Sequence, residues 1–197
     1  MGYTGGAAAH PTYHRLGDHT ETVQIDFDAQ RISYAQLLVI FWQSHQPGRQ
    51  AWSQQYKAAV FYHSEEQRRL ALESRERVTA RLKAKIFTEI LPGSAFFLAE
   101  DYHQKYYLHQ VPELWREFTA IYPVPVVLVN STAAARVNGY LAGHGTLESF
   151  QADLPGLGLS PPARAKLQKI VSGSNLMKRS LSKGKDDEGS CPLPPTP

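Results

Sequence analysis

The sequence is poor in cysteine, and it has neither a long apolar run nor a large excess of one charge. Its single cysteine, Cys191, excludes an intramolecular disulfide and a cysteine-based zinc site, and such sparse usage suits a reducing compartment. No run approaches the ~20 apolar residues of a membrane-spanning helix, and the Gly-rich start lacks the apolar segment of a signal peptide. We therefore expect no membrane partner and a cytoplasmic location, with an organelle left open should residues precede Met1.

Charge is nearly balanced along the chain. There are 21 Lys and Arg residues against 18 Asp and Glu, a net charge of +3. In the most charged stretch, residues 68–85, acidic and basic residues are interleaved, which indicates a solvated helix face rather than a nucleic-acid stripe. We expect no nucleic-acid partner. With 42% hydrophobic residues, the chain can bury the core of one globular domain with appendages.

Strands and capped helices alternate in the first half of the chain, which predicts an α+β or α/β sandwich. A strand is expected where apolar and polar residues alternate, and a helix where Ser is followed three residues later by Gln and then by apolar residues at helical spacing. The expected elements are a half-buried strand at 21–28, a helix capped at Ser33 and ending near His45, a strand at 56–62, a helix from Ser64 to about Leu82 and a strand at 86–91.

The second half reads as helical. Apolar residues at helical spacing predict a helix over 111–122, broken by Pro123 and Pro125, and three short helical segments follow within 131–172. Beyond them, Ser, Lys, Asp and Pro dominate, so the tail is expected to be disordered. The expected domains are 1–110, a helical extension at 111–172 and a tail at 173–197.

Glu21 is the first candidate for chemistry. It shares the parity of Val23, Ile25 and Phe27 in the expected strand, so its carboxyl group is expected to be partly removed from water. Loss of water favours the neutral form, which can act as a general acid near neutral pH. The alternative is that Glu21 marks the exposed end of a strand, since Glu is rarely fully buried.

A metal site is the next hypothesis. His10, His14 and His19 lie close to Asp18 and Glu21, and all five are residue types that bind zinc or iron. Their spacing is not a specific ligand pattern, and a site without cysteine needs three or four well-aimed groups. We therefore expect no metal and no other cofactor.

Five motifs carry a family resemblance that covers residues 2–108. They are Gly2-Tyr3-Thr4-Gly5-Gly6, Pro11-Thr12-Tyr13, Asp18-His19-Thr20-Glu21, Gln55-Tyr56 and Ala99-Glu100-Asp101-Tyr102-His103-Gln104. Together they closely resemble the methionine sulfoxide reductase A family. The resemblance implies a two-layer α/β sandwich of the kind that this family adopts, followed here by the helical extension and tail.

The resemblance also implies a reaction, the reduction of methionine S-sulfoxide, free or in proteins, with thioredoxin as reductant. In this family a cysteine thiolate attacks the sulfoxide sulfur while a glutamate protonates the oxygen, and Glu21 matches that glutamate. Tyr13 and Tyr56 match the tyrosines whose hydroxyl groups bond the sulfoxide oxygen. The substrate-binding residues that the resemblance implies are His19, Asp101, Tyr102 and His103.

The family's nucleophile lies in a Gly-Cys-Phe-Trp motif upstream of the Gly-Tyr-x-Gly-Gly turn, and the printed chain begins at that turn. We therefore expect this chain to be an N-terminally shortened form of the reductase, inactive as printed because it lacks the nucleophilic cysteine. The alternative is a pseudoenzyme, a module that binds methionine sulfoxide or a protein partner without turnover. Retention of Glu21, Tyr13 and Tyr56 does not separate the two.

Overall fold

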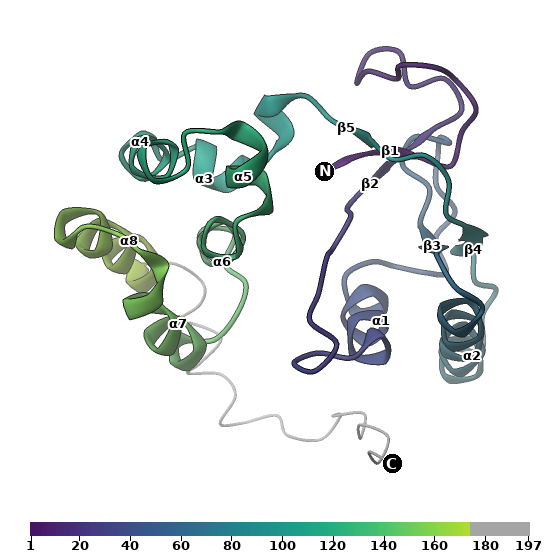
Figure 1. Ribbon diagram of the computed structural model, residues 1–197. Coiled ribbons are helices and arrows are strands. Elements are labelled where there is room, and N and C mark those ends of the chain that lie inside the picture. The colour runs from purple at the N-terminus through teal and green to yellow at the C-terminus, as the bar shows by residue number, and fades with distance from the viewer. Residues whose placement is uncertain (174–197) are drawn as a thin grey trace. The chain divides into compact units, whose positions relative to one another are not determined.

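The computed structural model describes residues 1–173, which form two compact units that divide between Asp101 and Tyr102 (Figure 1). The division precedes the expected domain boundary at 110, because helix α3 (Tyr106–His109) packs against later helices. Apart from Gly173, which ends a helix, the expected disordered tail lies outside the described residues.

The first unit contains two small sheets and two helices. In chain order its elements are β1 (Gly2–Thr4), β2 (Thr20–Thr22), α1 (Tyr34–Gln43), β3 (Ala59–Tyr62), α2 (Glu65–Leu82), β4 (Glu89–Pro92) and β5 (Phe97–Leu98). The first sheet is antiparallel in the order β2-β1-β5, and the second pairs β3 with β4 in parallel. This mixture confirms the expected α+β class.

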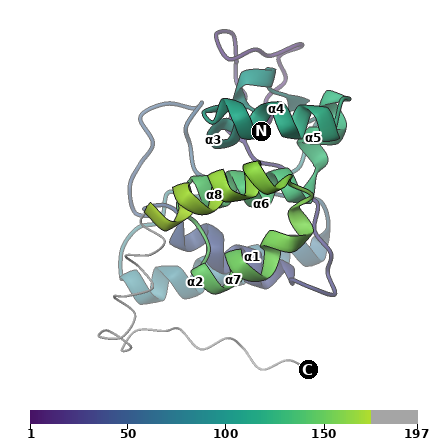
Figure 2. The ribbon, with the colours of Figure 1, turned by 90° about the vertical axis from the view of Figure 1, so that its left-hand side faces the viewer.

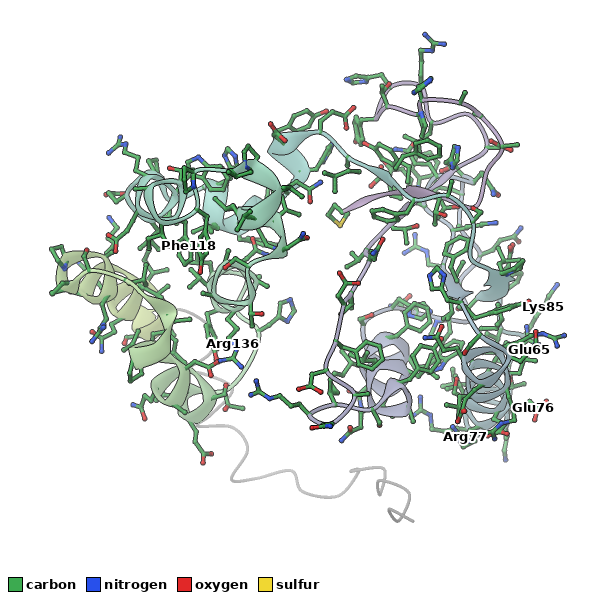
Figure 3. The ribbon with its side chains drawn as sticks, viewed as in Figure 1. Glu65, Glu76, Arg77, Lys85, Phe118 and Arg136 are labelled. Carbon is green, nitrogen blue, oxygen red and sulfur yellow. The ribbon has the colours of Figure 1, made fainter. Side chains whose placement is uncertain are left out.

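Helix starts in this unit follow the expected caps. Ser33 and Gln36 form a reciprocal capping box at the start of α1, and the Ser64 hydroxyl accepts from the Gln67 N–H at the start of α2. Most charged side chains of α2, among them Glu65, Glu76 and Arg77, are exposed (Figure 3). The helix pair and the parallel sheet form two layers, because Val60 of β3 and Ile90 of β4 pack on the buried side chains of the helices.

The prediction of a strand at 21–28 is wrong over most of that range. It ends at Thr22 rather than Asp28, and Val23 and Ile25 are 58% and 57% exposed. The register explains the short strand, since Gly2 pairs with Thr22 in an antiparallel ladder and residues 24–28 therefore lie beyond the end of β1. The alternation of apolar and polar residues predicted a longer strand, but it carries no information on how far a neighbouring strand extends. The strands expected at 56–62 and 86–91 form over the shorter spans of β3 and β4.

A buried hydrogen bond joins the two helices of the first unit. Leu38, Trp42, Ala71 and Val78 form the core between them. The Trp42 indole N–H donates to the Ser74 hydroxyl oxygen at 2.9 Å, and that hydroxyl donates to the Ala71 carbonyl at 2.7 Å. Both partners of the indole bond are buried, so water cannot replace either of them.

Ser74→Ala is expected to destabilise the first unit by about 1–3 kcal/mol, because the Trp42 N–H is left buried without an acceptor. Urea denaturation followed at the Trp42 signal measures the change. The control is Thr79→Ala, which removes an exposed hydroxyl from the same helix and is expected to change the free energy of unfolding by less than about 0.5 kcal/mol. Equal effects of the two substitutions would contradict a stabilising role for the hydrogen bond between Trp42 and Ser74.

The second unit is entirely helical within its described residues. After a short 3-10 turn at Asp101–His103 come α3, α4 (Pro112–Ile121), α5 (Pro125–Asn130), α6 (Thr132–Leu141), α7 (Leu147–Asp153), a second 3-10 turn at Leu154–Leu157 and α8 (Pro161–Gly173). The helix expected at 111–122 and the three segments expected within 131–172 are confirmed. Helix α5 was not expected, since Pro125 was read as a breaker. Pro125 occupies the first turn of α5. A backbone N–H at this position would have no acceptor within the helix, so the proline, which lacks one, costs no hydrogen bond.

Helices of the second unit enclose a core of their own. Helix α8 lies along α6 (Figure 2), and the two contribute Val137 and Leu167 to the same apolar cluster as Phe118 of α4. At its edge, Asp153 accepts hydrogen bonds from Arg136 at 2.5 Å and from the Tyr140 hydroxyl at 2.6 Å. None of the helices in residues 1–173 combines the length and apolar character that a membrane span requires.

Candidate functional site

Strand β2 brings Glu21 beside Gln55. The Glu21 backbone N–H donates to the Gln55 carbonyl at 3.0 Å, and the Gln55 side-chain N–H donates back to Glu21 Oε1 at 2.5 Å. The Thr20 hydroxyl donates to the Gln54 carbonyl one residue earlier. The end of the strand is thus fastened to segment 54–56 by both backbone and side chains, which fixes the position of the Glu21 carboxyl group.

Two tyrosines complete the same cluster. Gln55 Nε2 also donates to the Tyr56 hydroxyl oxygen at 3.2 Å, and the Tyr56 and Tyr13 hydroxyl oxygens lie 3.4 Å apart. The structure therefore brings together Glu21, Tyr13 and Tyr56, the three residues expected to carry catalysis. Gln55 had been given no role from the sequence, although its place next to Tyr56 in a motif was a signal that could have found it.

Tyr56 is a proton donor rather than a base. The hydrogen bond with Tyr13, together with loss of hydration and the nearby Glu21, raises the pKa of Tyr56 to about 12. Tyr56 therefore keeps its proton at neutral pH. Its side chain is 41% exposed, and those of Tyr13 and Glu21 are half-buried, so a ligand oxygen can reach all three. Such donors stabilise negative charge that develops on an oxygen.

Glu100 holds Tyr13 in place. Its Oε1 accepts from the Tyr13 backbone N–H at 3.0 Å, and its Oε2 accepts from the hydroxyl group of buried Tyr3 at 2.6 Å. One carboxylate therefore ties the loop that carries Tyr13 to strand β1. In the sequence Glu100 stands out only as a member of a motif, because nothing in its spacing shows which segments it joins.

His19 lies in the interior and not on a ligand-accessible surface. Only 1% of it is exposed, its Nδ1 accepts from the Gly6 N–H at 3.2 Å, and its Nε2 donates to the Ala8 carbonyl at 2.8 Å. A substrate contact through either ring nitrogen would require breaking one of these bonds. Whereas the sequence predicted a substrate-binding role, the geometry of His19 is that of a support for the loop at residues 6–8.

Asp18 supports the same loop from outside. Its carboxylate accepts from the Ala7 N–H at 2.8 Å and from the Ala8 N–H at 3.1 Å. These hydrogen bonds favour the charged form and hold the pKa of Asp18 below its ordinary value of 3.8. Because the pKa of Asp18 is lower in the folded state, its carboxylate contributes fully to stability above its ordinary pKa. This contribution is lost as the pH falls through the lowered pKa of the folded state.

Acidification from pH 5 to pH 2 is therefore expected to release the Ala7 and Ala8 amides as Asp18 becomes protonated. NMR chemical shifts and hydrogen exchange of these two amides measure the release. In Asp18→Asn, whose side chain does not titrate, the same amides are expected to show no such transition. A transition of the same shape in the Asn variant would assign it to another group.

The other predicted substrate residues lie where the units divide. Asp101 ends the first unit and is exposed, while Tyr102 and His103 begin the second, with ring centroids 4.2 Å apart. Their substrate-binding role stays a prediction.

The histidines considered as metal ligands are not gathered around one point. His10 and His14 are exposed, and both ring nitrogens of His19 already make hydrogen bonds within its own loop. No three His, Cys, Asp or Glu side chains within residues 1–173 are placed to hold a metal ion.

A hollow of about 450 Å³ lies elsewhere in the first unit, between residues 22–27, helix α1 and strand β3. Its walls are mostly apolar, with Leu38, Phe41 and Val60 among them, and none of Glu21, Tyr13 and Tyr56 lines it. We place the site at Glu21, because convergent donors at an accessible surface supply the chemistry that apolar walls lack.

Two family models match most of the chain. The family model "Peptide methionine sulfoxide reductase" matches residues 1–120, and "Selenoprotein methionine sulfoxide reductase A, helical domain" matches residues 127–170. A "Peptide methionine sulfoxide reductase" of Drosophila melanogaster is 40% identical over 169 residues, 83% of this chain and 66% of that protein. "Peptide methionine sulfoxide reductase A5" of Arabidopsis thaliana is 39% identical over 148 residues, 72% of this chain and 57% of that protein.

The chain thus spans just under two thirds of the first of these relatives and less of the second. A crystal structure of Mxr1 from Saccharomyces cerevisiae overlaps with 58% of this chain and 66% of that one, at 26% identity and a TM-score of 0.45, an overlap too low to support an argument about the site. The first family model matches well over half of the 197 residues. The chain therefore belongs to the peptide methionine sulfoxide reductase family.

Proposed function

We propose that the Glu21 site reduces the S epimer of methionine sulfoxide, free or in proteins, in a protein in which a thiol nucleophile accompanies this chain. The observation that carries the proposal is the hydrogen-bonded cluster of Glu21, Gln55, Tyr56 and Tyr13. It presents one carboxyl group and two phenols, all reachable by a ligand oxygen. These are the groups that binding and protonating a sulfoxide oxygen requires.

In the proposed reaction the thiolate attacks the sulfoxide sulfur, and Glu21 gives its proton to the oxygen as negative charge develops on it. Tyr13 and Tyr56 donate hydrogen bonds to the same oxygen. The S–S bond formed by this attack and the S–O bond of the substrate then both break as the hydroxyl group becomes bound to the cysteine sulfur. The sulfoxide is thereby reduced to a thioether while the thiol is oxidised to a sulfenic acid. A further thiol then reduces the sulfenic acid, and we propose thioredoxin in the cytoplasm as its source.

To test this, a Gly-Cys-Phe-Trp segment is joined to the start of the chain. Reduction of racemic N-acetylmethionine sulfoxide by the extended protein is then measured with dithiothreitol as reductant. Consumption of the S epimer alone is expected, with loss of activity when the added cysteine is changed to serine. The 197-residue chain is expected to give no turnover, because carboxylates and phenols are poor substitutes for a thiolate. Activity that survives the serine change, or consumption of the R epimer, would contradict the proposal.

A second function, sulfoxide binding without turnover, is favoured by the lone cysteine, since Cys191 is the single thiol in the 197 residues. The two functions differ in the mass of the protein in its native source. A protein that carries the Gly-Cys-Phe-Trp segment would be heavier than the 22.0 kDa of this chain. Intact mass spectrometry of the native protein separates them, and a mass of 22.0 kDa would favour the binding function.

A further inference from the structure

We propose that Gln55 is the positioning residue of the site: its two side-chain N–H groups turn both proton donors, Glu21 and Tyr56, toward one substrate oxygen. The inference rests on the proposed function, and it assigns a role to a residue that touches neither the substrate sulfur nor its oxygen. It follows from a count of donors and acceptors at three side chains of the first unit.

The primary amide of Gln55 has two N–H groups, and the structure uses both. One donates to Glu21 Oε1 at 2.5 Å, and the other donates to the Tyr56 hydroxyl oxygen at 3.2 Å. Because the amide nitrogen can only donate, Glu21 Oε1 and the Tyr56 hydroxyl oxygen must both accept in their contacts with Gln55. No proton of Glu21 or Tyr56 can lie in either of these two contacts.

That restriction orients the proton of the carboxylic acid. When Glu21 is protonated, Oε1 already accepts from Gln55, so the proton resides on the other carboxyl oxygen, Oε2. The same holds for the phenol. Because the Tyr56 oxygen accepts from Gln55, its own O–H is free to point to Tyr13, 3.4 Å away, or to a ligand oxygen in its place. Both donors are thereby aimed before a ligand arrives.

The backbone holds the amide where these bonds require it. The Gln55 carbonyl accepts from the Glu21 N–H at 3.0 Å, and the neighbouring Gln54 carbonyl accepts from the Thr20 hydroxyl at 3.1 Å. Gln55 is half-buried, whereas Gln54 is exposed and its side chain makes only a long contact, 3.5 Å, to the Asp18 carbonyl. The two neighbouring glutamines thus offer a matched pair, one inside the cluster and one outside it.

The experiment measures ligand preference in the complete 197-residue chain, with no added thiol. NMR titration gives the affinities for N-acetylmethionine sulfoxide and for N-acetylmethionine, which differ by the oxygen that the donors bind. The wild-type chain is expected to prefer the sulfoxide. Gln55→Met, which keeps the length and loses both N–H groups, is expected to lower this preference about tenfold, the effect of losing about one oriented hydrogen bond. Gln54→Met is expected to leave it unchanged.

A second variant separates donor function from space filling. Gln55→Glu has the shape of glutamine, but at neutral pH it has no donor and adds a negative charge next to Glu21. If Gln55 acts through its N–H groups, the Glu variant loses at least as much sulfoxide preference as the Met variant. If it only fills space, the Glu variant keeps the preference better than the Met variant, and the inference is wrong.

The outcomes also separate this inference from the proposed function. A wild-type chain that binds sulfoxide and thioether equally well would overturn the proposed function, and the inference with it. A wild-type preference that both Gln55 variants retain would overturn the inference alone. General damage to the fold weakens binding of both ligands together, so it does not mimic a selective loss of sulfoxide binding.

Discussion

Glu21→Gln in the thiol-bearing protein is expected to lower the rate of sulfoxide reduction about 10²–10⁴-fold, the range for losing general acid catalysis. Glutamine keeps the size of the side chain and can still accept from Gln55 Nε2 at the atom that corresponds to Oε1. It cannot give up a proton. The loss is therefore expected in the chemical step, with little change in substrate affinity, and single-turnover kinetics between pH 6 and 8 measure it.

Other variants calibrate this effect. Tyr13→Phe and Tyr56→Phe are each expected to cost less, because the two hydroxyl oxygens lie 3.4 Å apart and either can bond the same substrate oxygen. Glu89→Gln is the matched control, since Glu89 of β4 is a half-exposed carboxylate that pairs with Lys57 and makes no contact with the cluster. This substitution is expected to leave the rate unchanged. An unaltered rate in Glu21→Gln across this pH range would remove Glu21 from the role of acid.

Phe118→Ala is expected to destabilise the second unit by about 3–5 kcal/mol, because it opens a cavity in a close-packed core. Phe118 of α4 (Figure 3) has no exposed surface. It belongs to the same apolar cluster as Leu114 of its own helix and Leu167 of α8. Its ring also lies parallel to that of Tyr122, with centroids 6.2 Å apart. The neighbours of a ring held on several sides can close only part of the space that it leaves.

Fluorine NMR of fluorotryptophan-labelled protein measures this change unit by unit. Trp115 reports on the second unit and Trp42 on the first, so urea titration gives a separate midpoint for each. Phe118→Ala is expected to lower the Trp115 midpoint. The control is Val126→Ala in α5, at a side chain that is 53% exposed, with an expected effect below about 0.5 kcal/mol. Equal midpoints for the two variants would show that Phe118 does not support the core.

Helices α1, α2 and α4 were predictable from the sequence because their signals are local. The hydroxyls of Ser33 and Ser64 cap α1 and α2 within three residues along the chain, and apolar residues at helical spacing mark the buried faces of α1 and α4. A helix also satisfies its backbone within itself, so neither its start nor its buried face depends on a distant segment. The motifs around Tyr13, Glu21 and Tyr56 likewise indicated side chains that the fold brings into one cluster.

Strand ends and the connections of the site were decided only by tertiary structure. A strand satisfies its backbone through a partner, so β2 stops at Thr22, opposite Gly2, although its alternation continues to residue 28. For the same reason the sequence did not show that Gln55 would join Glu21 to Tyr56, or that both nitrogens of His19 would be used inside a loop. Side-chain hydrogen bonds join residues that lie far apart in the chain, here Glu21 and Gln55, and their partners exist only once the chain has folded.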